Sequence, residues 1–156
     1  VSNYSKKLSI NTQLNSANFG FHTISKYTKA DIVCVHEGEL RQDLRSPSKD
    51  INLLAKELSK KIKSKQIFIT QGAKGALSYD NKNLINCPAF TNKVIDKVGA
   101  GDTFLSIVSV CSFVGMPNTL SLFIGNLFGS IAVSSIGNSV EFKKNIILKT
   151  IKNLIK

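Results

Sequence analysis

The residues best suited to chemistry stand together at Gly99, Ala100, Gly101 and Asp102, between an apolar stretch that starts at Val94 and a long apolar run. The pattern predicts an extended segment, a tight glycine turn and a helix that begins at the turn. The first N–H groups of a helix have no internal partner and lie at the positive end of its dipole, and glycine lets a bulky anion approach them. A carboxylate beside them can take a proton from a hydroxyl. The pattern therefore suggests phosphoryl transfer to an alcohol, although a plain strand-to-helix connection capped by Asp102 also fits it.

Two other polar segments follow short, buried-type strands, predicted over 31–35 and 66–70. The first strand leads into His36-Glu37-Gly38-Glu39, and the second leads into a loop with Gly72 and Gly75. Ligands of open parallel sheets collect at these carboxyl ends. In isolation, however, the two glutamates also fit as ordinary acids of a first helical turn.

The remaining periodicity alternates helices with strands, which predicts an α/β fold with a largely parallel sheet. A helix is expected to start at Pro47 with Ser48 as its N-cap, and Glu57 and Lys61 are spaced to form an i,i+4 ion pair on it.

After Asp102 the next charged residue is Glu141. Two buried helices on a sheet or a transmembrane hairpin could account for this run, and its interruption near Pro117 and its many polar residues favour the buried helices. Gly125 and Gly129 match a helix-dimer motif. The second helix is expected to end at 137–138.

Composition describes one globular domain: 156 residues, 42% hydrophobic and 20% charged. Three well-separated cysteines and the lack of a signal peptide favour reduced thiols in a cytoplasmic protein. The net charge of +11 comes from lysines scattered among other residues, which favours solvated helix faces over a nucleic-acid surface.

The glycine segment resembles the C-terminal signature of the PfkB, or ribokinase-like, carbohydrate kinases. The family pattern is Asp-Thr-Thr-Gly-Ala-Gly-Asp followed by an aromatic residue. Lys97 and Val98 replace the two threonines, and Ile107 stands where a small residue is usual. The matching residues are Asp96, Gly99, Ala100, Gly101, Asp102 and Phe104.

This resemblance implies that Asp102 is the base that deprotonates a sugar hydroxyl, and that the 99–101 turn is the anion hole for the transferring phosphate. Glu39 matches the glutamate of the family's Asn-x-x-Glu motif, with His36 in place of the asparagine. It would help to hold Mg²⁺ through water, since a carboxylate near a phosphate needs a cation between them.

Three further residues match the family's Thr-x-Gly-x-x-Gly loop, which lies beside the nucleotide phosphates: Thr70, Gly72 and Gly75. Asn126 lies where the family has an asparagine near the adenine pocket, and a satisfied core asparagine is the alternative. The implied cofactor is Mg-ATP.

The resemblance implies a three-layer α/β/α fold in which residues 1–156 form a single domain, the C-terminal half of such a kinase without its N-terminal half. Some segments also resemble bacterial sugar kinases linked to nucleotidyltransferase modules. The expected partners are a nucleotide and a sugar or sugar phosphate, with no nucleic acid or membrane, and a homodimer is left open. A non-catalytic nucleotide-binding fragment and a basic nucleic-acid-binding domain are the alternatives.

Overall fold

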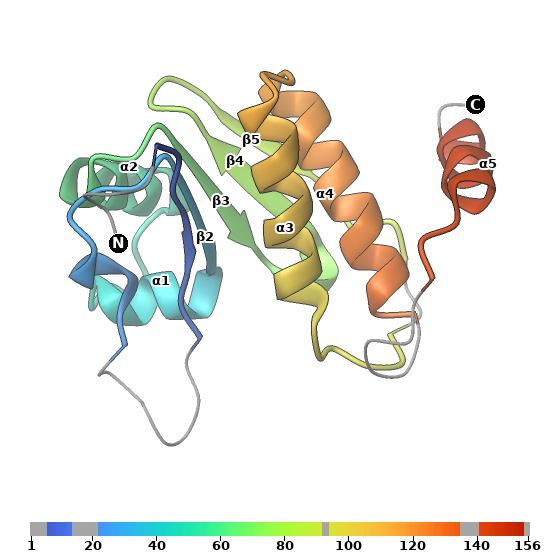
Figure 1. The fold of residues 1–156 in the computed structure, drawn as a ribbon. Coiled ribbons are helices and arrows are strands. Elements are labelled where there is room, and N and C mark those ends of the chain that lie inside the picture. The colour runs from blue at the N-terminus through green and yellow to red at the C-terminus, as the bar shows by residue number, and fades with distance from the viewer. Residues whose placement is uncertain (1–5, 14–21, 92–93, 135–140, 155–156) are drawn as a thin grey trace.

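A computed structural model of the chain describes residues 6–13, 22–91, 94–134 and 141–154. A five-stranded sheet in the order β1-β2-β3-β4-β5 lies between two layers of helices (Figure 1). In chain order, the elements are β1 (Ser9–Asn11), the 3₁₀ helix η1 (Ile24–Lys26), β2 (Ile32–His36), α1 (Glu37–Asp43), α2 (Ile51–Ile62), β3 (Gln66–Thr70), the 3₁₀ helix η2 (Gly72–Lys74), β4 (Ala76–Tyr79), β5 (Leu84–Cys87), α3 (Ala100–Phe113), α4 (Asn118–Ala132) and α5 (Lys144–Leu154).

The first three strands are parallel, and His36 at the end of β2 pairs with Thr70 at the end of β3. A hairpin then adds β4 antiparallel to β3, and β5 antiparallel to β4. Asp80 shapes the turn of this hairpin, because its Oδ1 accepts hydrogen bonds from the N–H groups of Lys82 and Asn83, at 3.0 and 2.8 Å. The predicted α/β/α architecture is confirmed, with β4 running against the other four strands.

Alternating side chains of the strands supply two separate cores, as a two-residue period requires. On one face Val33, Val35, Ile67 and Ile69 pack with residues of α1 and α2, among them Leu40, Leu54, Leu58 and Ile62. On the other face Cys34 and Phe68 pack with Phe104 and Val108 of α3 and Leu122 of α4. Two covered faces explain why the strands read as continuous apolar runs.

The N-cap of helix α2 lies two residues later than the sequence predicts. Its N-cap is Asp50, whose Oδ1 accepts hydrogen bonds from the N–H groups of Asn52 and Leu53 at 2.9 and 3.4 Å, so the assignment of Ser48 is wrong. The predicted pair of Glu57 with Lys61 is also wrong. Glu57 instead binds Lys49, 2.6 Å away, because the loop before the helix folds back along it.

The long uncharged run forms α3 and α4, of 14 and 15 residues, which lie side by side on one face of the sheet (Figure 1). Among the described residues, no helix is long and apolar enough to cross a bilayer. Helix α4 ends at Ala132 rather than at 137–138, which lie outside the described residues.

Helix α5 stands at the far end of the molecule and has no buried residue (Figure 1). The segment before it contacts α4 through the rings of Phe142 and Phe128, whose centroids are 4.9 Å apart.

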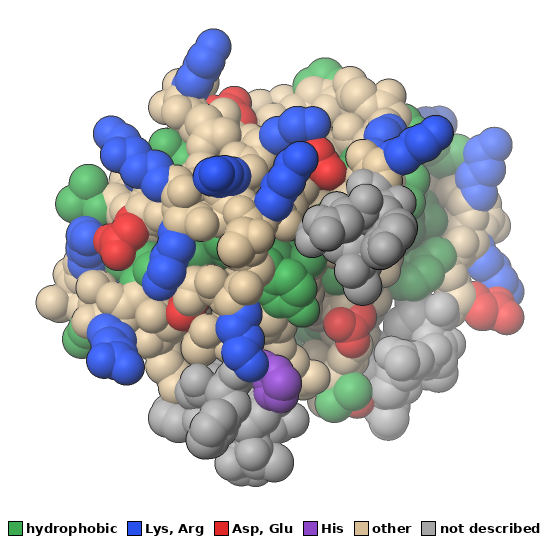
Figure 2. Space-filling view, turned by 60° about the vertical axis from the view of Figure 1, so that its left-hand side comes forward, with side chains coloured by type: hydrophobic (Ala, Val, Ile, Leu, Met, Phe, Trp, Pro, Cys, Tyr) green, Lys and Arg blue, Asp and Glu red, His purple; other side chains and the backbone are tan. Residues whose placement is uncertain are grey.

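The three cysteines are unpaired and buried, as predicted for reduced thiols. Figure 2 views the molecule with its α1 and α2 side brought forward. Lysine and arginine side chains are spread widely over this face, with acidic side chains between them.

Candidate active site

The glycine turn before α3 is held by contacts on both sides. Gly99 adopts φ +76°, a left-handed conformation that glycine reaches without strain. The Oδ1 atom of Asp96 accepts a hydrogen bond from the N–H of Val98 at 2.9 Å. The N–H groups of Ile95 and Asp96 both donate to the carbonyl of Val133, beyond the end of α4, at 2.7 and 3.2 Å. Over residues 94–98, the predicted extended segment before the turn is an irregular connection that pairs with no described strand, and Ile95 is 49% exposed.

Asp102 is the third residue of α3 and is exposed to solvent. Gly99 occupies the N-cap position and no side chain caps the helix, so the alternative assignment of Asp102 as the cap is wrong. Two residues further on, the ring of Phe104 packs edge-on against Phe68 of β3, with centroids 5.9 Å apart. This buried contact fixes the first turn of α3, and with it Asp102, over the sheet.

The His36 and Glu39 side chains form a capping box at the start of α1. The Nδ1 atom of His36 accepts from the N–H of Gly38 at 3.1 Å, and Oε2 of Glu39 accepts from the N–H of His36 at 2.9 Å. The glutamate predicted to serve Mg²⁺ thus also satisfies the helix terminus. A metal contact would share this carboxylate with the cap.

The carboxylate of Glu37 contacts side chains from two parts of the chain at this edge of the sheet. It accepts hydrogen bonds from Nε2 of Gln71 at 2.7 Å and from Nε of Arg41 at 2.8 Å, and Nη2 of Arg41 forms an ion pair with it at 2.7 Å. The hydrogen bond from Gln71 and the neighbouring Arg41 guanidinium hold the pKa of Glu37 below its usual value. Glu37 therefore ties α1 to the loop that follows β3.

That loop, loop 70–75, is closed on itself by its own backbone. The N–H of Gln71 donates to the carbonyl of Gly75 at 2.8 Å, and the N–H of Gly75 donates to the carbonyl of Gly72 at 3.0 Å. Gly75 has φ +101° and lies directly against the chain after β5, where a Cβ would lie only 2.6 Å from the carbonyl carbon of Pro88. Gly72 has φ +59° and open space around it.

Asn126 is buried, and its side-chain amide binds the end of β5 and the residue after it. Its Nδ2 donates to the carbonyls of Cys87 and Pro88 at 2.9 and 2.7 Å. These bonds give Asn126 the structural role that was the alternative to nucleotide binding. A contact with a nucleotide stays a prediction.

Cys34 lies on β2, two residues before His36, and is buried. The thiol of Cys34, on β2, has its pKa raised to about 12, chiefly by burial and further by the negative charges of Glu39 and Asp102. Helix α1, which carries Glu39, follows β2 directly, and α3, which carries Asp102, is packed on β3 through Phe104. The pairing of His36 with Thr70 places loop 70–75 at the same edge.

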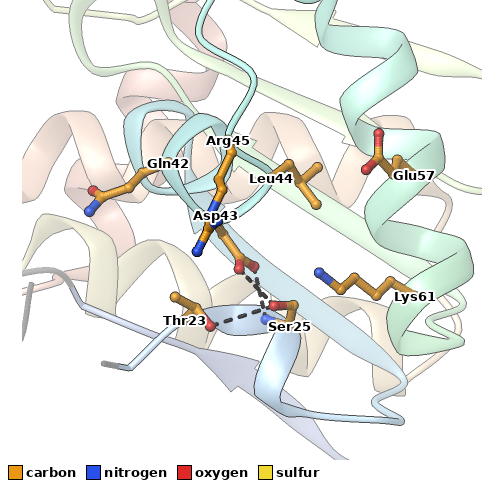
Figure 3. A pocket seen from close by; sticks show the side chains of 8 residues that line it. All are labelled: Thr23, Ser25, Gln42, Asp43, Leu44, Arg45, Glu57 and Lys61. Carbon is orange, nitrogen blue, oxygen red and sulfur yellow. Dashed lines mark hydrogen bonds between the residues drawn. The ribbon is translucent and has the colours of Figure 1, made fainter. Parts of the chain in front are cut away.

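A pocket of about 700 Å³ lies elsewhere, between η1, the end of α1 and α2 (Figure 3). It contains no predicted site residue. Its two carboxylates already have partners, since Asp43 accepts from the hydroxyl and N–H of Ser25, and Glu57 binds Lys49. We therefore place the candidate active site at the carboxyl edge of the sheet rather than in this pocket.

The described residues contain no group of three or more His, Cys, Asp or Glu side chains that could enclose a metal ion. A single carboxylate such as Glu39 suits Mg²⁺, which usually keeps its waters and binds one or two carboxylates together with substrate phosphates. The donors therefore fit a metal carried in with a nucleotide.

The domain thus combines an α/β/α fold with a glycine turn, an aspartate in the following helix and a glycine loop at the carboxyl edge of the sheet. A family model described as pfkB family carbohydrate kinase matches residues 6–144. The chain belongs to this family, and the resemblance seen in the sequence is confirmed.

Individual relatives match parts of longer proteins. Inositol 3-kinase of Arabidopsis thaliana is 38% identical over 71 residues, covering 46% of this chain and 20% of that protein. Bifunctional protein HldE of Helicobacter pylori is 24% identical over 127 residues, covering 80% of this chain and 27% of that protein. A crystal structure of a putative ribokinase II from E. coli in complex with ATP and Mg²⁺ has a TM-score of 0.67 at 23% identity, covering 80% of this chain and 40% of that one. The chain thus spans well under half the length of these proteins.

Sequence reasoning missed the contact between Glu37 and Gln71 and the role of Asp96 in the turn. The spacing of Asp96 two residues before Val98 is a visible signal for a side chain that bonds the backbone two residues on. No local signal joins Glu37 to Gln71, because 34 residues separate them.

Proposed function

We propose that this chain is the nucleotide-binding and catalytic part of an ATP-dependent kinase that phosphorylates a hydroxyl of a sugar or sugar phosphate. The observation that carries the proposal is the geometry of the sheet: α1 and loop 70–75 follow the paired ends of β2 and β3, at His36 and Thr70, and α3 is packed on β3 through Phe104 and Phe68. Membership of the pfkB family supports the same reaction class.

In the proposed reaction Asp102 takes the proton of the acceptor hydroxyl as its oxygen attacks the γ-phosphorus of ATP. The bond from the γ-phosphorus to the β,γ-bridging oxygen breaks, and ADP leaves. The backbone of Gly99, Ala100 and Gly101 would stabilise the charge on the transferring phosphoryl group, because the N–H groups of a first helical turn have no acceptor within the helix. A Cβ at Gly101 would meet nothing within 4 Å, so this side of the turn is open to a ligand.

Four residues are proposed to hold the nucleotide and one to serve its metal. Loop 70–75 would lie beside the phosphates through Thr70, Gly72 and Gly75, and Asn126 would contact the base. Glu39 would hold Mg²⁺ through water, and the ion would neutralise phosphate charge. The complex of a relative with ATP and Mg²⁺ supports this choice of cofactor.

We further propose that acceptor recognition comes from the part of the kinase fold that this chain does not match. The matched portion of the solved relative is 40% of its chain. Turnover is therefore best measured in the full natural polypeptide, and this chain alone is expected to bind nucleotide with little or no transfer. A linked nucleotidyltransferase module, a homodimer and a cytoplasmic location stay predictions.

Replacing Asp102 by Asn should lower acceptor-dependent ADP release roughly 10²–10⁴-fold, because the base is lost, while Mg-ATP affinity stays near that of the unmutated protein. The matched control is Asp50→Asn, which changes another exposed aspartate at a helix N-terminus and keeps a good N-cap. Turnover of the Asp102→Asn protein near that of the control would rule out the proposed base.

A non-catalytic nucleotide-binding fragment is the second candidate, favoured by the short match to the relatives. Calorimetry with Mg-ATP together with an assay of ADP release over a panel of sugars and sugar phosphates separates the two. If the full polypeptide binds Mg-ATP but releases no ADP with any acceptor, the non-catalytic nucleotide-binding function is favoured. Salt-sensitive binding of DNA without nucleotide binding would instead favour the basic nucleic-acid-binding alternative.

A further inference from the structure

Glu37 is held by two hydrogen bonds and an ion pair that come from two different parts of the chain. One carboxylate oxygen accepts from Arg41 on the next turn of α1, and the other accepts from the Gln71 side chain, which follows β3. The side chains of Glu37 and Arg41 are only 20% and 25% exposed. Charge-assisted hydrogen bonds in such a half-buried setting are stronger than those of exposed pairs.

Arg41 is itself fixed. Its Nη1 donates to the carbonyls of Pro47 and Lys49 at 3.1 and 2.7 Å. The guanidinium therefore anchors the carboxylate of Glu37 to the segment before α2. Neither oxygen of Glu37 can turn away without breaking a contact.

The partner on the other side, Gln71, is the residue on which loop 70–75 closes. Its N–H donates to the carbonyl of Gly75 at 2.8 Å, and its own carbonyl accepts from the N–H of Lys74 at 3.3 Å. Holding the Gln71 side chain therefore sets the orientation of the whole loop. The far end of the loop is held independently, where Gly75 lies against Pro88.

We infer that Glu37 is a positioning residue that couples the helix carrying Glu39 to loop 70–75, so that the metal side and the phosphate side of the nucleotide site are held in one arrangement. This inference rests on the proposed function. Glu37 acts through Gln71 rather than by touching the nucleotide.

The test measures Mg-ATP affinity by calorimetry and amide hydrogen exchange in loop 70–75 without nucleotide. Glu37→Gln places an amide N–H against the N–H of Gln71. It should weaken Mg-ATP binding roughly tenfold and speed exchange at Gln71, Lys74 and Gly75. Gln71→Ala should do the same, and combining Glu37→Gln with Gln71→Ala should cost little more than either alone, because both remove the hydrogen bond between Glu37 and Gln71.

A reciprocal exchange gives the positive control. Glu37→Gln combined with Gln71→Glu reverses the direction of the hydrogen bond and leaves an amide oxygen to accept from Arg41. Loop protection should then recover to near the level of the unmutated chain. Glu57→Gln, which breaks the exposed pair with Lys49 on α2, is the matched variant expected to change neither measurement.

The inference is overturned if the unmutated chain binds Mg-ATP and Glu37→Gln leaves both affinity and loop exchange within twofold. It is also overturned if the reciprocal exchange restores nothing. Failure of the unmutated chain to bind Mg-ATP would overturn the proposed function, and the inference with it.

Discussion

At the scale of single residues, Gly75 is the position where side-chain size and backbone conformation are most restricted. Its φ of +101° lies outside the range that L-residues favour, and a Cβ there would approach Pro88 and Ala89 to 2.6 and 2.7 Å. These neighbours are backbone atoms, which cannot move aside as a flexible side chain could. The glycine that the family pattern assigns to the nucleotide loop is thus also a packing requirement.

Gly75→Ala should lower the free energy of unfolding by roughly 2–4 kcal/mol, because it adds an overpacked contact to a strained φ. Gly101→Ala is the matched control, since Gly101 is helical and a Cβ there meets nothing within 4 Å. It should be neutral or stabilising by up to about 1 kcal/mol. Urea unfolding measures both, and equal stability of the two variants would contradict the close approach at Gly75.

At the scale of elements, the pairing of α3 with α4 decides where Asp102 stands. Gly125 on α4 faces Val108 and Phe104 on α3, so that a Cβ would touch Val108 Cγ1 and lie 3.1 Å from Phe104 Cε2. The two glycines that match a helix-dimer motif are therefore used inside the chain, where they let α4 lie close to α3. Phe104 in turn packs on Phe68 and carries the first turn of α3.

Gly125→Ala should destabilise the protein by roughly 1–3 kcal/mol, because the added methyl group pushes α3 and α4 apart. Gly129→Ala makes the same substitution one helical turn later, where the added Cβ would lie 3.9 Å from its nearest neighbour, Cδ2 of Phe104. That variant should change the free energy of unfolding by less than about 1 kcal/mol. Thermal or urea unfolding compares them, and the reverse order of stability would contradict the described packing.

At the scale of the whole molecule, Asp31 joins the amino ends of the parallel strands. Its carboxylate accepts from the N–H of Leu8 before β1 at 2.9 Å and binds Lys65 before β3 at 2.8 Å. The hydrogen bond from Lys65 is the main reason that the pKa of Asp31 is lowered. In the hairpin, backbone N–H groups, chiefly that of Asn83, likewise lower the pKa of Asp80.

These shifts predict acid sensitivity. A carboxyl whose pKa is lower in the folded state stabilises the fold above its ordinary value of 3.8, and this contribution is lost as the pH falls through the folded pKa, because the unfolded chain binds the proton first. The free energy of unfolding should therefore fall below about pH 4. Asp31→Asn should be less stable at pH 7 and should lose less stability on acidification. Urea unfolding at pH 7, 5 and 3 checks this, and parallel losses in both proteins would contradict it.

The sequence by itself determined much of this protein. Buried β-branched runs predicted β2 to within one residue at each end and β3 over its full length, because local apolar pattern reports burial on both faces of a sheet. The order of Glu39, loop 70–75 and the glycine turn was enough to indicate the family. These signals are local in the chain, and each depends on residue type and spacing alone.

Only the tertiary structure decided the partners of the polar side chains. Glu57 binds Lys49 rather than Lys61, Asn126 binds the carbonyls of Cys87 and Pro88 at the end of β5, and Glu37 binds Gln71, 34 residues away. A hydrogen bond needs partners within about 3 Å, and that proximity depends on how strands and helices pack rather than on separation along the chain. The glycine turn and Asp102 could be read as a candidate site from the sequence, but the fold was needed to show that α3 is packed on β3 through Phe104 and Phe68.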